Sequence, residues 1–127
     1  MKTFLRVEHG VDKYLKKYYL GMYQSSVAIS SLRGERHPMP EKDQELAFQC
    51  DLGKVLSFEN PVVYLFAFPD IASLKSWVYE PDWLKELHRL GYVLSVYECD
   101  DGYHGDTQSI FNFEKAQLKH RLNLLEV

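Results

Sequence analysis

The clearest alternation of apolar and polar residues lies in the C-terminal third of the chain. Gly91 stands where a helix would end, because glycine readily adopts the left-handed backbone conformation found just beyond helix C-termini. Residues 92–97 then alternate with a period of two and are rich in aromatic and β-branched side chains, a pattern typical of a strand. A polar turn over residues 100–106 follows, and residues 107–113 alternate again. The pattern predicts a β-hairpin with a long acidic loop that carries His104.

A continuous apolar stretch marks a second strand. Residues 62–68 are apolar at every position, which predicts a strand that is covered on both faces and lies in the middle of the sheet. Asp70 stands at the N-cap position of the helix that should follow. A further helix begins near Pro81 and ends at Gly91. The apolar stripes of these two helices should cover one side of the sheet.

The N-terminal alternation predicts a first strand over residues 3–8. Leu5 and Val7 should face the core, which places Arg6 and Glu8 together on the opposite face. An arginine in this position could offer a bidentate fork to a phosphate or pyrophosphate. The alternative is an exposed strand arginine that pairs with Glu8 or with another neighbour.

The remaining segments complete an α+β outline. Residues 11–21 allow either a helical turn or an aromatic loop, and residues 23–32 contain a further strand. Residues 33–43 form a loop because of two closely spaced prolines, and residues 41–51 form a short helix with Leu46 and Phe48 near the core. Residues 114–125 carry leucines at helical spacing, namely Leu118, Leu122 and Leu125. We therefore expect one domain over residues 1–127, with a mixed, mainly antiparallel sheet, short helices on one side and a C-terminal helix.

Composition predicts a folded protein that is not a general binder of nucleic acids or membranes. Of the 127 residues, 46% are hydrophobic and 14% are aromatic, which is enough apolar surface for a core. A net charge of −3 lacks the strong basic face that nucleic acids and anionic membranes usually require. No apolar run approaches the roughly 18 residues of a membrane helix. Cys50 and Cys99 form no CxxC pair, so we expect free thiols in a cytoplasmic protein.

The acidic loop is one candidate for chemistry. Dense carboxylates can bind a divalent cation through oxygen ligands. The spacing fits no calcium or zinc motif, and Asp-Asp-Gly is ordinary turn chemistry, so we predict no metal site. The same carboxylates could instead imitate nucleic-acid phosphates toward a basic partner. The residues concerned are Asp100, Asp101 and Asp106.

A cluster of tyrosines and lysines near the N-terminus is a second candidate surface. Tyrosine packs widely and keeps a polar tip, so such clusters serve protein interfaces and ligand stacking. Interleaved lysines also allow a small nucleic-acid contact, and ordinary half-buried packing is the alternative. The cluster consists of Tyr14, Tyr18, Tyr19 and Tyr23, with Lys13, Lys16 and Lys17 between them. The partner-binding surface predicted within it is Tyr14, Lys16, Lys17, Tyr18 and Tyr19.

Short motifs follow one another in a distinctive order between residues 4 and 113. They are FLRVEHG, GMYQ, RHPMPEKD, YLFAFPDIASLKSW, LGYVLSVYECD and GDTQSIFNF. This order resembles that of an uncharacterised group of small phage and prophage proteins. In that group an arginine strand, a Gly-x-Tyr, a His-Pro-x-Pro-x-x-Asp loop and a Phe-x-Phe strand succeed one another. The resemblance implies a phage-encoded protein that acts in the cytoplasm of the host cell.

The layout is also similar, more distantly, to the mixed α+β core of ADP-ribosyltransferases. The resemblance implies NAD as a ligand, with Arg6 in the role of the residue that holds the dinucleotide and Tyr64 on the middle strand. The serines at positions 25 and 26 are the alternative to Tyr64. Gln108 falls where these enzymes have a glutamate, and an amide carries no charge to stabilise an oxocarbenium ion. Glu98, on the neighbouring strand, is the only nearby carboxylate that could replace it.

Two hypotheses about function follow. The first is a small phage-encoded interaction protein without a cofactor, such as an anti-defence inhibitor that binds a host protein or nucleoprotein complex. The second is an NAD-binding relative of ADP-ribosyltransferases that uses Arg6, Tyr64 and Gln108. The sequence predicts neither the host target nor the oligomeric state, and it does not decide whether the protein is an enzyme.

Overall fold

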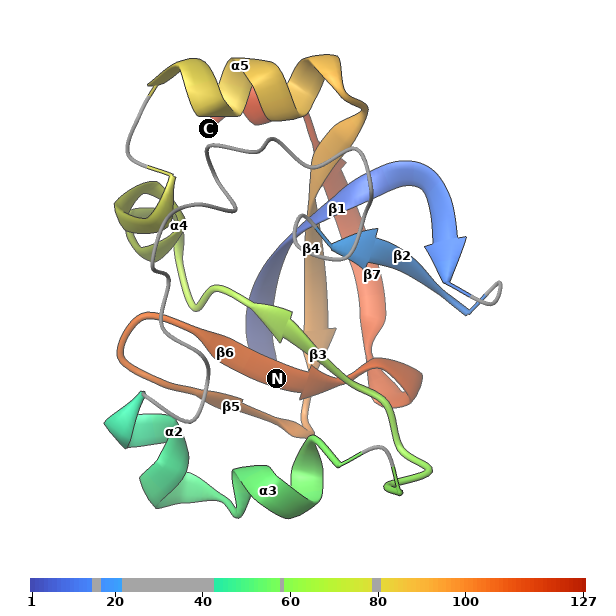
Figure 1. The fold of residues 1–127 in the computed structure, drawn as a ribbon, viewed down its shortest axis with the longest axis vertical. Helices are drawn as coiled ribbons and strands as arrows, with labels where there is room; N and C mark the ends of the chain where they lie inside the picture. Colours follow the sequence, from blue (N-terminus) through green and yellow to red (C-terminus); the bar gives the residue numbers. More distant parts are fainter. Residues whose placement is uncertain (15–16, 22–42, 58, 79–80) are drawn as a thin grey trace.

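The fold is built on two antiparallel sheets, seen in the computed structural model, which describes residues 1–14, 17–21, 43–57, 59–78 and 81–127 (Figure 1). The four-stranded sheet has the order β2-β1-β4-β7 and consists of β2 (Tyr18–Gly21), β1 (Lys2–Tyr14), β4 (Tyr92–Cys99) and β7 (Gln117–Leu122). The three-stranded sheet has the order β3-β6-β5 and consists of β3 (Tyr64–Ala67), β6 (Ser109–Asn112) and β5 (Gly102–His104). A bridge between Leu5 and Phe68 joins the two sheets.

Short helices lie at both ends of the molecule in Figure 1. They are α2 (Gln44–Gln49), α3 (Leu52–Val55), α4 (Ile71–Trp77) and α5 (Pro81–Arg89), with 3-10 turns η2 (Phe113–Lys115) and η3 (Leu124–Glu126). Asp70 caps α4, and its carboxylate accepts a hydrogen bond from the backbone N–H of Ser73. Gly91 adopts a φ of 97° just after α5. These features confirm the predicted α+β class and the predicted limits of both helices.

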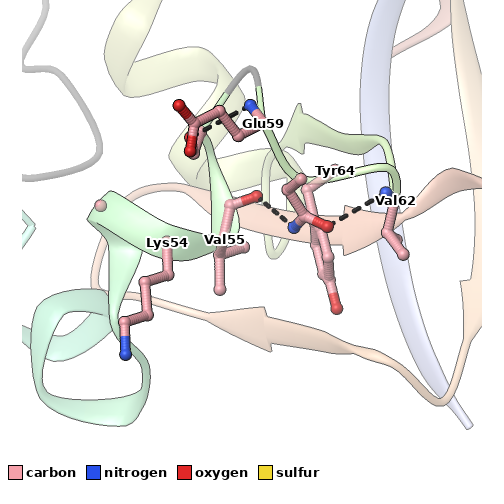
Figure 2. Close-up of a pocket in the computed structure, with 8 residues that line it drawn as sticks. Lys54, Val55, Glu59, Val62 and Tyr64 are labelled. Carbon is pink, nitrogen blue, oxygen red and sulfur yellow. Dashed lines mark hydrogen bonds between the residues drawn. The ribbon is translucent and has the colours of Figure 1, made fainter.

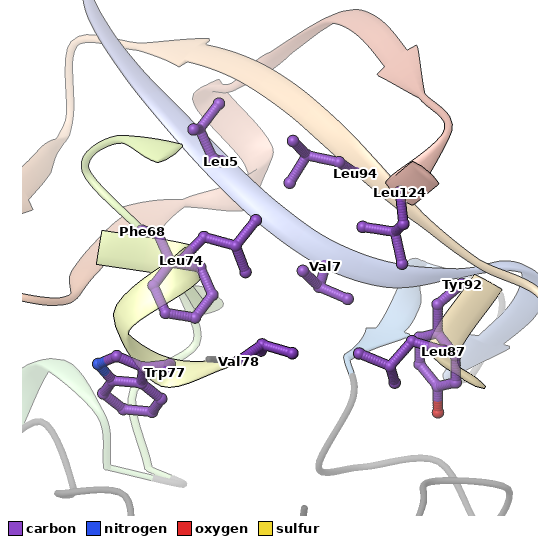
Figure 3. Packing of buried hydrophobic residues seen from close by; sticks show 10 residues of the cluster. All are labelled: Leu5, Val7, Phe68, Leu74, Trp77, Val78, Leu87, Tyr92, Leu94 and Leu124. Carbon is purple, nitrogen blue, oxygen red and sulfur yellow. The ribbon is translucent and has the colours of Figure 1, made fainter. Parts of the chain in front are cut away.

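The main hydrophobic core lies between one face of the four-stranded sheet and the helices α4 and α5. Figure 3 shows its side chains, which come from β1, β4, both helices, η3 and the residues Phe68 and Val78 that flank α4. They are Leu5, Val7, Phe68, Leu74, Trp77, Val78, Leu87, Tyr92, Leu94 and Leu124. The predicted inward direction of Leu5 and Val7 is therefore confirmed. Because strand side chains alternate, Arg6 and Glu8 must occupy the opposite face of β1.

The apolar stretch at residues 62–68 forms a strand, as predicted, but its predicted place in the middle of the sheet is wrong. β3 stands at one end of the order β3-β6-β5. Within the described residues, one backbone bridge, between Leu5 and Phe68 just after β3, and a side-chain hydrogen bond from Arg6 to the Phe66 carbonyl connect it to β1. Phe66 is 45% exposed, so the strand is not covered on both faces. A continuous apolar run does not distinguish a covered strand from one whose outer face holds an exposed aromatic ring.

The predicted C-terminal helix over residues 114–125 is also wrong. Residues 117–122 form β7, which pairs antiparallel with β4 and leaves only the short turn η3 after it. An irregularity opposite Val96 and Tyr97 shifts the register, so that Leu118 and Leu122 fall on opposite faces although their spacing is even. Pairing with β7 satisfies backbone groups of β4 that a helix would have left without partners.

The predicted hairpin between residues 92–97 and residues 107–113 is wrong, because β4 pairs with β1 and β7 in one sheet and β6 pairs with β3 and β5 in the other. The loop with His104 instead contains β5, which pairs with β6.

Two further segments differ from the predictions. Residues 11–21 form neither a helical turn nor a loop where they are described, because β1 extends to Tyr14 and pairs with β2. The helix predicted within residues 41–51 is confirmed as α2, with Leu46 buried, but Phe48 is 89% exposed instead of near the core. The predicted strand at residues 23–32 and nearly all of the loop at 33–43 lie outside the described residues.

Candidate functional site

A buried ion pair occupies the polar face of the four-stranded sheet. Arg6 is 4% exposed and Glu8 is 0% exposed, and Arg6 Nε donates to Glu8 Oε2 at 3.1 Å. The expected pairing of Arg6 with Glu8 is confirmed, whereas the expected exposure of the arginine is wrong. Burial lowers the pKa of Arg6, and the neighbouring Glu8 carboxylate opposes that shift. The pair is thus an internal feature of the sheet.

The second oxygen of Glu8 collects donors from neighbouring strands. Glu8 Oε1 accepts from Ser95 Oγ at 2.6 Å and from Tyr97 Oη at 2.8 Å, both on β4. Arg121 Nη2, on β7, lies 3.8 Å from the same oxygen. The pairing of β1 with β4 and of β4 with β7 aligns Arg6, Ser95 and Arg121 in one row across the sheet. Register therefore assembles a cluster whose members are distant in sequence.

The guanidinium of Arg6 also ties three strands together. Its Nη1 donates to the carbonyl of Phe66 on β3 at 2.9 Å, and its Nη2 donates to the carbonyl of Tyr19 on β2 at 3.2 Å. A phosphate or dinucleotide at Arg6 would therefore have to displace these carbonyls and Glu8. The arrangement suits a structural clamp, because buried charges are tolerated when their hydrogen-bonding groups are satisfied.

The outer layer of this cluster is a tyrosine ring that contacts two cations. Lys13 Nζ lies 4.5 Å and the guanidinium carbon of Arg121 lies 4.3 Å from the centroid of the Tyr19 ring. Arg121 Nε also donates to Ser95 Oγ at 3.4 Å, and Arg121 Nη1 donates to the Gly10 carbonyl at 3.3 Å. Lys13 and Arg121 are exposed and Tyr19 is half-buried. We refer to Lys13, Tyr19 and Arg121 as the cation–tyrosine surface.

The comparisons with known proteins identify the family. A family model described as Bacteriophage T4 Y00F protein matches residues 1–125. The chain belongs to this family. No curated protein and no solved structure matched the chain. The predicted resemblance to a group of phage proteins is confirmed, while the resemblance to ADP-ribosyltransferases stays a prediction.

The structure describes part of the predicted tyrosine–lysine cluster of this phage protein. Tyr19 belongs to the cation–tyrosine surface, Lys17 is exposed, and Tyr18 makes an edge-on contact with Phe113 with ring centroids 5.9 Å apart. Lys16, Tyr23 and the side chain of Tyr14 lie outside the described part of the chain. Arg121 was missed by the sequence analysis, since its segment was predicted to be the C-terminal helix.

The three aspartates of the acidic loop have different environments. Asp100 is exposed and lies 3.9 Å from the N-terminal amine, and Asp106 is exposed in the turn between β5 and β6. Asp101 is partly buried, and its carboxylate oxygens accept from Tyr64 Oη at 3.0 and 2.9 Å and from Asn112 Nδ2 at 3.0 Å. Burial and the hydrogen bond to Asp101 raise the pKa of Tyr64. Asp101 therefore joins β3, β5 and β6.

The residues predicted for an enzyme belong to separate hydrogen-bonded groups. Arg6 is held by Glu8 and two backbone carbonyls, and Tyr64 is bonded to Asp101. Gln108 is buried in the turn before β6, beside the buried carboxylate of Asp43. That carboxylate accepts backbone N–H bonds from Leu46, Asp106 and Thr107, which fastens α2 to the turn.

The protein also has a pocket of about 540 Å³ beside β3 (Figure 2). Its lining residues are Gly53, Lys54, Val55, Ser57, Glu59, Asn60, Val62 and Tyr64. Asn60 holds one wall, since its side chain donates to the Val55 carbonyl at 3.0 Å and accepts from the Val62 amide at 3.0 Å. Lys54 and Glu59 are both exposed, so the pocket lacks the buried, convergent polar groups that fix a small ligand.

A serine–histidine pair in β5 and β6 was also missed by the sequence analysis. His104 Nδ1 lies 2.6 Å from Ser109 Oγ. Ser109 is 0% exposed, so a substrate cannot reach its hydroxyl, and the pair is structural. In the described part of the chain, no group of three or more His, Cys, Asp or Glu side chains could hold a metal ion. No helix among the described residues is long and apolar enough to cross a membrane.

Proposed function

We propose that this phage protein acts by binding a host protein through the cation–tyrosine surface. The observation that carries the proposal is the contact of the Tyr19 ring with two cations, Lys13 and Arg121, at 4.5 and 4.3 Å from the ring centroid. Tyrosine and arginine are enriched among the residues that dominate binding energy at protein interfaces. The surface shares Lys13 and Tyr19 with the predicted tyrosine–lysine cluster and adds Arg121 to it.

The buried cluster supports the proposal because it orders this surface before a partner arrives. Arg6 Nη2 fixes the backbone carbonyl of Tyr19 at 3.2 Å, and Glu8 lies 3.8 Å from Arg121. Ordering long side chains on binding costs about 0.5–1.5 kcal/mol for each one, so side chains already held in place bind at a lower cost. Arg6 and Glu8 are themselves buried, but they position the surface residues Tyr19 and Arg121.

Charge complementarity supports a partner that presents carboxylates. Lys13 and Lys17 are exposed cations and the side chain of Arg121 is 29% exposed, in a protein whose net charge is −3. A small basic area on an acidic protein favours an acidic protein surface over the long phosphate backbone of a nucleic acid, which needs a broad basic face. The target class that we propose is a host protein or nucleoprotein complex, such as one that defends against phage, whose acidic surface is blocked by this contact.

The NAD-binding alternative has no comparable support. It would require Arg6 to exchange Glu8 and two backbone carbonyls for a dinucleotide. We therefore propose binding to a host protein, and we do not propose a transferase reaction.

The proposal is tested by capturing partners from host lysate with the whole protein and measuring the Kd of the recovered partner. Lys13→Glu and Tyr19→Ala should each weaken binding at least about tenfold, which corresponds to about 1.4 kcal/mol. Lys75→Glu on α4 and Phe48→Ala on α2 are matched controls, because both side chains are exposed on other elements. Controls that weaken binding as much as the two test variants would overturn the proposal.

A further inference from the structure

The strand β7 is an exposed edge of the four-stranded sheet. It ends the order β2-β1-β4-β7, and each of its residues, Gln117–Leu122, is exposed. Edge strands present unpaired backbone groups that can pair with a strand from another chain. In Figure 1, β7 runs alongside β4, and the four-stranded sheet shows no further strand beyond it within the described residues.

The hydrogen bonds of β1 indicate which backbone groups of β7 face outward. Leu5 exchanges both backbone bonds with Phe68, at 3.0 and 2.6 Å, so its N–H and C=O point away from β4. Val96, opposite Leu5, therefore directs its own groups to the other side, toward His120 on β7. Because the direction alternates along a strand, the N–H and C=O of Arg121 point away from β4.

The charges of β7 indicate what kind of strand would pair with it. Lys119, His120 and Arg121 are consecutive and exposed. Lys119 lies 3.7 Å from Glu98 in an exposed ion pair, and such pairs contribute little to stability and exchange readily. Antiparallel pairing of two copies centred on His120 would bring Lys119 of one copy opposite Arg121 of the other, and like charges in that position are destabilising. Acidic side chains would be attracted at the same positions.

We propose that the outer edge of β7 binds an extended acidic segment of the partner protein as an added strand. The inference rests on the proposed function, because Arg121 belongs both to the edge and to the cation–tyrosine surface. The register irregularity beside Lys119 and the three basic residues disfavour neutral, apolar strands. An acidic segment would gain backbone hydrogen bonds at Arg121 and opposite charges at its neighbours, which gives both affinity and selectivity.

The test follows hydrogen exchange of the Arg121 amide by NMR with a synthetic peptide in which glutamate alternates with valine. At a peptide concentration a hundredfold above its Kd, exchange at Arg121 should slow by about a hundredfold. A peptide of the same length with lysine in place of glutamate is the control and should cause no protection. Binding of the acidic peptide without protection of Arg121 would overturn strand addition, since contacts by side chains alone leave that amide in water.

Variants separate this inference from the proposed function. Lys119→Glu should weaken the acidic peptide at least about tenfold, whereas Lys75→Glu should not. A host partner that is sensitive to Tyr19→Ala but leaves the Arg121 amide unprotected would retain the proposed function and remove strand addition. Protection of Arg121 in a concentrated sample without peptide would instead indicate self-association and overturn an acidic partner for this edge.

Discussion

The two faces of the four-stranded sheet are formed by the same strands but are stabilised by different interactions. On one face, Leu5, Val7 and Leu94 pack against α4 and α5 in the main core (Figure 3). On the other, Arg6 and Glu8 are equally buried but are surrounded by hydrogen-bond partners. Apolar packing depends on area and shape, whereas the polar face depends on each partner being present. The comparison shows that alternation alone does not decide which face of a sheet meets water.

The largest effect is expected from removing one member of the buried ion pair. Glu8→Ala leaves Arg6 buried without its carboxylate, which should lower the free energy of unfolding by about 3–5 kcal/mol. Urea unfolding followed by circular dichroism measures the change. The double variant Arg6→Met/Glu8→Leu should recover part of the loss, because it removes the unpaired charge of Arg6 but leaves the hydroxyls of Ser95 and Tyr97 without the Glu8 acceptor. A double variant as unstable as Glu8→Ala would contradict the unpaired charge of Arg6 as the cause of the loss.

A cavity on the apolar face should have a similar or slightly smaller effect. Leu94 is fully buried in the main core, so Leu94→Ala should cost about 2–5 kcal/mol in the same unfolding assay. Unlike the ion-pair variant, it has no second-site partner whose removal restores stability. Affinity for the partner at the cation–tyrosine surface should not change while the protein remains folded. A loss of affinity in proportion to the loss of stability would remove the distinction between the faces.

A second buried carboxylate sharpens the comparison, because backbone amides hold it instead of an arginine. Burial raises the pKa of Asp43, but the backbone N–H bonds of Asp106, Thr107 and Leu46 outweigh it and leave the pKa below its ordinary value of 3.8. A folded-state pKa that is depressed stabilises the protein above the unfolded pKa, and this contribution is lost as the pH falls through the folded value.

Asp43→Asn should therefore lower the unfolding free energy by about 1–3 kcal/mol at pH 7. The difference from the unsubstituted protein should shrink in urea titrations below pH 3.8, the ordinary value for this group. Asp82→Asn, on the exposed surface of α5, is the control and should change stability by less than about 0.5 kcal/mol. If the difference in unfolding free energy between Asp43→Asn and the unsubstituted protein stays constant with pH, the backbone amides do not stabilise the charged form of the Asp43 carboxylate.

The smallest effect on stability is expected at the outer layer of the polar face. Lys13→Ala removes one exposed cation from the Tyr19 ring, and such contacts contribute about 0.5–1 kcal/mol. Thermal unfolding should therefore change only slightly, while the affinity for an acidic partner falls. A large loss of stability in this variant would place Lys13 among the structural residues of the sheet.

Much of the fold follows from local sequence, and the candidate site does not. Gly91, the cap at Asp70 and the alternation over residues 92–97 act within a few residues, so the sequence predicts them correctly. The cluster at Glu8 depends on the register between strands that are far apart in the chain, and no local pattern specifies that register. The sequence wrongly predicts a helix for β7, because Leu118 and Leu122 are spaced as on one face of a helix. The register shift places these two leucines on opposite faces of the strand, so the sequence of β7 lacks the regular alternation of a strand.

The central claim is that the buried carboxylate of Glu8 positions Arg121 in the cation–tyrosine surface. A double-mutant cycle in unfolding free energy with Glu8→Gln and Arg121→Ala tests it most directly, since the two side chains lie 3.8 Å apart. We expect a coupling free energy between Glu8 and Arg121 of about 0.5–3 kcal/mol, the range measured for residues that share a hydrogen-bond network. Effects that add to within about 0.3 kcal/mol would contradict it.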